Sequence, residues 1–299
     1  PDGNKKSTDR NAMTGMALLC FLGHCELQDS ADYGNTVHRA IEFLTSTPPE
    51  DQNIGTGNRG SYSHPIRTYA LCEAFTMTKI KKLEPYAIRS TQFVIKGQNE
   101  NGGWAYGYKK GPTGHTDLSV TGWNIQALKA AALTGLYIDG IDEAMDKAIE
   151  YVKLCQDEVG RFKYKRSAHG GHSGHGSLTG TGVLSLQIWK NAKSDEANKG
   201  LEWIVKNLEN ETDWDHVSAY AWYYHAQACF QATSFSSGKK YWTAWNKNFE
   251  KIVHSAQASD GHWPPGANFH GDTDLYRTTM TILMLEVYYR FAPMGGGKH

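Results

Sequence analysis

One spacing of residue types recurs along the chain and constrains its fold more than any other feature. It reads Gln-x-x-x-Gly-x-aromatic. Three stretches carry it: Gln98, Gly102 and Trp104; Gln156, Gly160 and Phe162; Gln257, Gly261 and Trp263. Weaker traces stand at Asn58–His64 and around Trp214. Copies at intervals of roughly 40 to 60 residues indicate a repeat architecture, in which each repeat is one supersecondary unit.

Each copy follows a helix-like stretch and precedes a polar segment that leads into an apolar one. The glycine permits a turn that a residue with a Cβ atom resists. The glutamine amide can bond backbone groups at a helix end, which otherwise lack partners. We therefore interpret the three stretches as structural corners between helices rather than as sites of chemistry.

The segments between the corners are helical in pattern and of two kinds. Six are rich in small and apolar residues on several faces, which predicts inner helices: 11–23, 65–75, 118–133, 177–189, 217–230 and 276–291. Five carry their charges on one side, which predicts outer helices: 34–44, 84–95, 141–154, 195–208 and 241–256.

Alternating strand patterns are weak, so the expected fold class is all-α. We expect an α/α toroid of the α6/α6 type, with about six helix pairs in a single domain over residues 1–299. The absent first outer helix would precede Pro1, as in a fragment of a longer chain.

Composition excludes some functions. The 31 basic and 31 acidic residues balance to a net charge of zero, so the basic surface of a nucleic-acid binder is missing. No apolar run reaches the roughly 18 residues that a membrane span needs. The five cysteines form no CxxC pair and are expected to be small buried hydrophobes. No cofactor is expected.

The corner stretches resemble the QW repeats of squalene and terpene cyclases and the related repeats of protein prenyltransferase β subunits. The segments Thr121–Ala131, Lys240–Asn246 and Leu285–Pro293 further resemble bacterial prenyltransferase/squalene oxidase repeat proteins. The resemblance covers nearly the whole chain and implies the toroid fold, with a central cavity at the N-terminal ends of the inner helices. It also implies a weak preference for an extracytoplasmic setting in a bacterium.

The segment His270–Thr279 contains the first candidate site. Asp272 and Asp274 precede the last inner helix, where the resemblance to protonating cyclases implies a catalytic acid. The alternative is that one of them is the N-cap of that helix. Arg277 stands where prenyltransferases have a zinc-ligating histidine, so zinc-dependent prenyl transfer is not expected. Arg277 would instead bind an anion or pair with a carboxylate.

The second and third candidates also precede inner helices. His115 and Asp117 are a candidate acid–base pair, with Asp117 or Ser119 as an N-cap in the alternative reading. The Gly-rich stretch around His172 and His175, which follow His169 at intervals of three, suggests ligand contact, a metal site or an ordinary solvated loop. No metal is assigned to it.

Asp213, Asp215 and His216 precede the fifth inner helix. We expect aromatic and polar side chains to line the cavity, since aromatic faces stabilise cations and stack on sugar rings; ordinary core packing is the alternative. The predicted ligand-contacting residues of this kind are His64, Tyr69, Trp123, Trp222 and Tyr276.

Three functions remain open from the sequence. The first is a ligand-binding or interaction domain with an aromatic cavity. The second is an isoprenoid-processing cyclase or transferase. The third is a carbohydrate-active lyase or hydrolase, for which paired acid and base groups are needed. The corresponding partners are a small hydrophobic or glycan ligand, other protein chains or further domains of the same chain, without nucleic acid or a membrane span.

Overall fold

The computed structural model describes residues 9–49, 60–111, 115–165, 176–210, 212–266 and 273–288. Asp272, His169, His172 and His175 lie outside these residues. The described residues form helices and turns, with two isolated bridges, Ala105 with Thr116 and Gln156 with Phe162, in place of strands. None of the described helices is both long and apolar enough to cross a bilayer. The all-α prediction is confirmed.

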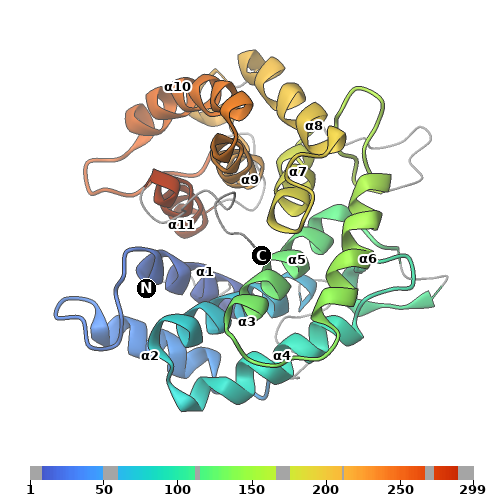
Figure 1. Cartoon of the computed structure of the whole chain (residues 1–299). Coiled ribbons are helices and arrows are strands. Elements are labelled where there is room, and N and C mark those ends of the chain that lie inside the picture. Colours follow the sequence, from blue (N-terminus) through green and yellow to red (C-terminus); the bar gives the residue numbers. More distant parts are fainter. Residues whose placement is uncertain are drawn as a thin grey trace. The chain divides into compact units, whose positions relative to one another are not determined.

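The chain divides into two compact units, residues 1–151 and 152–299. In unit 1 the helices α1, α3 and α5 pack on one another in succession, and we call them inner helices. The outer helices α2 and α4 lie against them (Figure 1). The bounds are α1 Arg10–Gly23, α2 Gly34–Leu44, α3 Gly60–Thr78, α4 Glu84–Lys96 and α5 Leu118–Leu133. Helix α6, Ile141–Leu154, crosses the boundary between the units.

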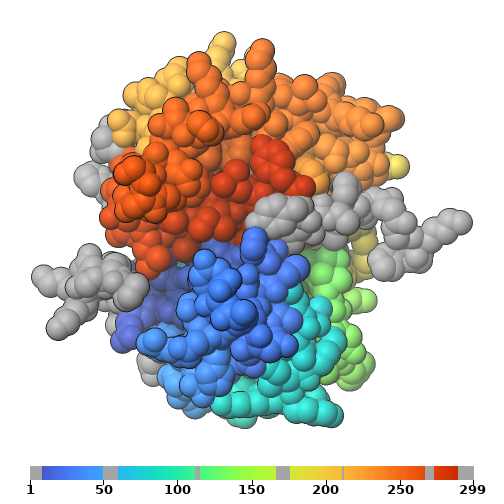
Figure 2. Space-filling view, turned by 90° about the vertical axis from the view of Figure 1, so that its left-hand side faces the viewer, coloured from blue at the N-terminus to red at the C-terminus, as the bar shows by residue number. Residues whose placement is uncertain are grey.

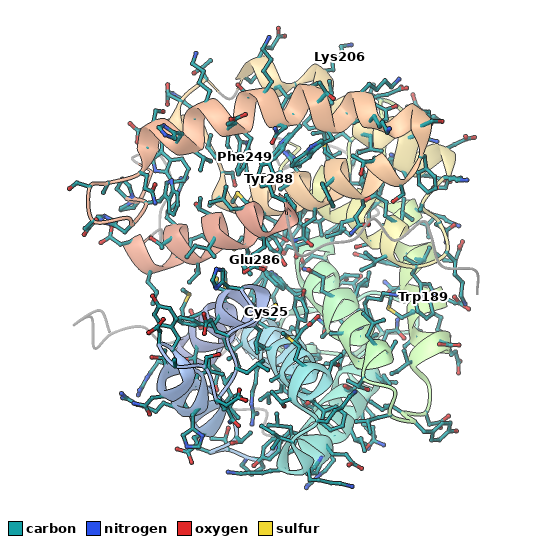
Figure 3. All side chains as sticks on the ribbon, turned by 60° about the vertical axis from the view of Figure 1, so that its left-hand side comes forward. Cys25, Trp189, Lys206, Phe249, Glu286 and Tyr288 are labelled. Atoms are coloured by element: carbon teal, nitrogen blue, oxygen red, sulfur yellow. The ribbon has the colours of Figure 1, made fainter. Side chains whose placement is uncertain are left out.

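Unit 2 repeats this alternation. The inner helices α7, α9 and α11 pack in succession, and the outer helices α8 and α10 lie against α7 and α9 (Figure 1). Their bounds are α7 Thr179–Ile188, α8 Asp195–Lys206, α9 Ala219–Gln231, α10 Lys239–Ala256 and α11 Asp274–Leu285. The core is aromatic between α9 and α10, where Trp245 stacks on Phe249 with ring centroids 4.4 Å apart. Phe249 projects from α10 toward the interior of unit 2 (Figure 3).

The difference between the two helix types follows from their composition. Inner helix α5 is buried on nearly every side, because it presents small and apolar residues all round. Outer helix α8 buries only Ala197, Gly200, Leu201 and Ile204, which recur at three- and four-residue intervals on one face. The charged residues of α8 therefore remain on the opposite face, in contact with water.

The three corner stretches share one geometry. In each, the glutamine Nε2 donates to the carbonyl of the glycine four residues later, at 2.8 Å for Gln98, 3.1 Å for Gln156 and 2.9 Å for Gln257. The glycine has a positive φ in each, between +88° and +92°. This is a conformation that L-residues with a Cβ atom avoid.

The aromatic residue of each corner connects the outer helix to the next inner helix. Its backbone N–H donates to a threonine Oγ1, from Trp104 to Thr121, from Phe162 to Thr179 and from Trp263 to Thr278. The two indoles also donate backwards, Trp104 to the Val94 carbonyl at 2.8 Å and Trp263 to the Val253 carbonyl at 2.9 Å. Each corner thus fixes the end of one helix against the start of the next.

Candidate functional site

The loop before α9 in unit 2 holds a carboxylate–imidazole pair. Asp213 Oδ1 accepts from the backbone N–H groups of Asp215 and His216, and His216 Nδ1 lies 2.7 Å from the same oxygen. The pKa of Asp213 is lowered, chiefly by the hydrogen bond to the His216 side chain. Asp213 is therefore a carboxylate at neutral pH, and it orients the ring of His216 so that Nε2 is left for another partner.

The loop before α11 holds a second pair. His262 Nδ1 lies 2.5 Å from Asp260 Oδ1, and His262 Nε2 lies 3.7 Å from Asp274 Oδ1. The hydrogen bond to His262 is the largest cause that lowers the pKa of Asp260. One imidazole therefore stands between two carboxylates, with all three side chains accessible to solvent. We call Asp213, His216, Asp260, His262 and Asp274 together the His–Asp rim.

Trp214 joins the two loops. Its Nε1 donates to the Pro264 carbonyl at 2.7 Å, and its ring lies against the guanidinium of Arg277, whose Cζ is 4.7 Å from the ring centroid. Arg277 is fully buried and donates from Nη2 to the Val217 carbonyl at 2.8 Å. These contacts place Arg277 beneath Trp214 as a support, because an arginine plane stacks on an aromatic face. Trp214 itself stays partly exposed.

This arrangement suits proton transfer. An imidazole that is oriented by a carboxylate can act as a general acid or base. Asp274 supplies a second titratable group next to His262. Among the described residues, no group of three or more histidine, cysteine or acidic side chains could hold a metal ion. The described side chains of the His–Asp rim can carry out acid–base chemistry.

Unit 1 has a chain of hydrogen-bonded hydroxyl groups at the N-terminal ends of α3 and α5. Tyr62 OH lies 2.6 Å from Tyr106 OH and 2.7 Å from Ser119 Oγ, and Ser119 Oγ donates to Asp117 Oδ1 at 2.7 Å. Asp117 is fully buried, whereas the two tyrosines are partly exposed. A continuous path of hydrogen bonds therefore runs from the protein surface to a buried carboxyl group.

Asp117 is also the N-cap of α5, since its Oδ1 accepts from the Val120 backbone N–H at 2.9 Å. This is the capping alternative that the sequence left open. His115 is exposed, two residues away, and Asp117 Oδ1 accepts from Ser119 Oγ and the Val120 backbone N–H. The pairing of His115 with Asp117 stays a prediction.

The cap of α11 corrects the sequence interpretation. The N-cap is Thr273, whose Oγ1 accepts from the Tyr276 backbone N–H at 3.1 Å. Asp274 is the first residue of the helix and is turned toward His262 instead. The hydroxyl of Thr273 satisfies the free N–H, so the alternative in which Asp274 is the N-cap of α11 is wrong. The other candidate, Asp272, lies outside the described residues.

The predicted ligand-contacting residues occupy different environments. Trp222 is buried between Trp245 and Phe249, at ring-centroid distances of 5.7 and 5.6 Å. The environment of Trp222 is that of core packing, the alternative to ligand contact that the sequence left open. Trp123 of α5 and Tyr69 of α3 are also buried.

His64 is also buried, with Nε2 3.1 Å from the Pro49 carbonyl and its ring 4.3 Å from that of Phe93. Tyr276 remains partly exposed in the first turn of α11, one residue before Arg277. Of the predicted aromatic wall, Tyr276 therefore stands nearest to the His–Asp rim along the chain.

Sequence reasoning missed Tyr62, Tyr106, Asp260 and His262 as candidates. His262 and Asp260 lie inside a stretch that the repeat marked as a structural corner, which hid their chemistry. A signal was present, because the other two corners carry Gly103 and Arg161 at the position of His262. The bond between Tyr62 and Tyr106 joins residues 44 positions apart, and no local pattern reveals it.

Comparison with known proteins gives the fold a precedent. The chain is similar to the structure of cellobiose 2-epimerase from Spirochaeta thermophila, with a TM-score of 0.66, 13% identity and coverage of 93% of this chain and 86% of that one. It is also similar to the α-1,6-mannanase GH76A from a Salegentibacter species, with a TM-score of 0.65, 13% identity and coverage of 96% and 90%.

At this identity the likeness establishes the fold alone, and that fold is the α/α toroid expected from the repeat. No family model and no curated protein matches the chain. The cyclase and prenyltransferase family that the corners resemble is therefore not shown.

Proposed function

We propose that this protein is a carbohydrate-active enzyme, a lyase or hydrolase, that acts on a glycan by acid–base catalysis at the His–Asp rim. The observation that carries the proposal is His262, held between Asp260 and Asp274 at the start of α11. Glycosidic bond cleavage needs a proton donor and a base. Two structural neighbours are, by their names, an epimerase of cellobiose and a mannanase, which supports a sugar ligand over an isoprenoid.

His262 is the proposed proton-transferring group. Its Nδ1 is held by Asp260, which keeps the ring in place, so Nε2 would exchange the proton with the substrate. Asp274 would stabilise the imidazolium that forms when His262 accepts a proton. The partly exposed ring of Trp214 offers an apolar face on which a sugar ring can stack.

The experiment is an activity screen with two readouts. The protein is incubated with neutral polysaccharides and with uronate-containing polysaccharides. New reducing ends are measured for either reaction, and ultraviolet absorbance of unsaturated uronides is measured for the lyase reaction alone. We expect His262→Ala to lower turnover by about 10²–10⁴-fold, the usual contribution of a general acid or base.

The matched control is His38→Ala. His38 lies 3.4 Å from Glu42 on α2 and is half exposed, so it is a histidine–carboxylate pair outside the rim. We expect this variant to keep full activity. Turnover that survives in His262→Ala would overturn the proposed role, and glycan binding without turnover by the unaltered protein would favour the ligand-binding function instead.

A further inference from the structure

The three corners differ in what covers them. At the first, Gln98 Nε2 donates not only to Gly102 but also to the Ala144 carbonyl of α6, at 2.7 Å. Gly102 is buried against the same helix, because a Cβ atom there would lie 2.1 Å from the Lys147 carbonyl oxygen. The corner is therefore the seat on which the N-terminal half of α6 rests.

The second corner repeats these contacts with α8. Gln156 Nε2 donates to the Glu196 carbonyl at 2.8 Å, and a Cβ atom on Gly160 would lie 2.5 Å from the Lys199 carbonyl oxygen. In both corners the carbonyl that the glutamine contacts lies three residues before the carbonyl that covers the glycine. One docking geometry is thus used twice, each time with an outer helix as the occupant.

The third corner has the same internal geometry, but no described helix covers it. Gln257 makes its bond to the Gly261 carbonyl and is exposed, and Gly261 is exposed where Gly102 and Gly160 are buried. No described atom lies within 4 Å of a Cβ built on Gly261. Figure 2 shows this loop in dark orange on the face of unit 2 toward the viewer.

A groove runs along α10, and its lining ends at His254, three residues before Gln257. At its other end Tyr288 contacts Trp242 and Asn246. The described lining of the groove includes Trp242, Asn246, Glu250 and His254, which recur every four residues along one side of the helix. The opposite flank of α10 is engaged with α8, where Tyr241 OH donates to Glu202. A groove that follows a helix for three turns has the length that a neighbouring helix fills.

The two seated helices also share a sequence signature. Aligned on the carbonyls that contact the corners, α6 reads Asp-Lys-Ala-Ile-Glu-Tyr over 146–151 and α8 reads Asn-Lys-Gly-Leu-Glu-Trp over 198–203. The position after the lysine is small in both, Ala148 and Gly200, and buried in both. A small residue at this position lets the helix backbone approach the glycine of the corner.

We propose that the third corner is the seat of a sixth outer helix, supplied by the same polypeptide from outside residues 1–299. The helix carries a small residue one position after the carbonyl that covers Gly261, as α6 and α8 do. Supply in cis follows from both precedents, in which the occupant belongs to the chain that forms the corner.

The test is hydrogen exchange of the backbone amides at 257–263, followed by mass spectrometry. It compares residues 1–299 alone with the complete polypeptide that contains them. In the complete polypeptide we expect exchange at this corner to slow by about tenfold or more, because a docked helix suppresses local opening. Equal exchange in the two proteins would overturn the proposal.

Gly261→Asn tests the geometry. Asparagine tolerates a positive φ better than other residues with a Cβ atom, and Gly261 has open space around it, so residues 1–299 should keep their exchange rates. In the complete polypeptide the new side chain would block the helix and remove the tenfold protection. The matched control is Gly135→Asn, since Gly135 also has a positive φ, +77°, and open space; it should change neither protein.

The oligomeric state completes the test. Light scattering on residues 1–299 should give a monomer, and the same mass should be found for Gly261→Asn. A dimer that Gly261→Asn dissociates would show that a second copy occupies the corner and would overturn supply in cis. Protection in the complete polypeptide that Gly261→Asn leaves intact would overturn the seat itself.

Discussion

At the scale of single residues, the three corner glycines share one backbone conformation, but adding a Cβ atom would destabilise the protein to different extents at the different corners. All three have φ near +90°, but only Gly102 and Gly160 face a helix carbonyl at less than 3 Å from an added Cβ. At Gly261 the cost of a side chain is backbone strain alone, about 1–2 kcal/mol. At Gly102 the strain is joined by overpacking, about 1–3 kcal/mol more.

We therefore expect Gly102→Ala to lower the free energy of unfolding by more than Gly261→Ala, by about 1–3 kcal/mol. Urea denaturation of both variants of residues 1–299 measures the difference. Since the φ values nearly match, Gly261→Ala is the control for strain. Equal losses would show that α6 does not press on the first corner.

His225 is the most perturbed histidine among the described residues. It lies on α9 against Gly180 of α7, and neither ring nitrogen has a described hydrogen-bond partner. Burial lowers its pKa from 6.5 to about 3. In the unfolded chain the ring takes up a proton near pH 6.5, so native stability is complete above that pH and is lost as the pH falls toward 3.

His225→Leu removes this titration. Between pH 7 and pH 5, the unfolding free energy of the unaltered protein should fall relative to that of the variant by about 2 kcal/mol. Urea denaturation at a series of pH values provides the measurement, with the exposed His254→Leu as control. Parallel pH curves for the unaltered protein and His225→Leu would mean that the ring is solvated or paired in solution.

At the scale of helices, the caps decide where α5 and α11 begin. Thr273 satisfies the Tyr276 backbone N–H, and an N-cap threonine contributes about 1 kcal/mol. Thr273→Ala should therefore lower the unfolding free energy by about that amount. Asp274→Ala should leave stability nearly unchanged, because its exposed carboxylate caps nothing. Thermal unfolding of the two variants distinguishes them, and the reverse order would restore Asp274 as the cap.

Most helices were predictable because their patterns are local. The predicted segments 118–133 and 141–154 coincide with α5 and α6, and 34–44 coincides with α2. The sequence predicts a helix over 65–75, yet α3 begins at Gly60 and contains that proline. Proline favours the first turn of a helix, so the sequence alone points to a helix start at Pro65. In α3 a further turn with the buried residues Gly60, Ser61 and Ser63 precedes it.

The candidate site was less predictable, because its geometry depends on contacts between loops. Asp213 and His216 could be found from their place before an inner helix. His262 could not, since its approach to Asp274 depends on how the third corner meets α11. The repeat predicts where the corners lie. Because it marks all three as structural, it gives no indication that the third one also carries Asp260 and His262.

At the scale of the whole molecule, ligand binding and catalysis depend on different side chains and can be measured separately. A glycan that binds only the native protein raises its stability by mass action, by about 2.7 kcal/mol at a hundredfold excess over the dissociation constant. For a chain of this size that corresponds to a shift of several degrees in the melting temperature. The shift depends on contacts with the sugar, such as stacking on Trp214, and not on proton transfer.

We therefore expect the proposed substrate to raise the melting temperature of His262→Ala as it does for the unaltered protein, while turnover is lost. Trp214→Ala should lose most of the shift, because it removes the apolar face next to the rim, and Trp214→Phe should keep part of it. Differential scanning fluorimetry across a concentration series gives the measurement. If Trp214→Ala keeps the full shift and His262→Ala loses it, His262 is a binding residue and the proton-transferring group lies elsewhere, with the Tyr62–Tyr106 hydroxyl chain of unit 1 as the next group to alter.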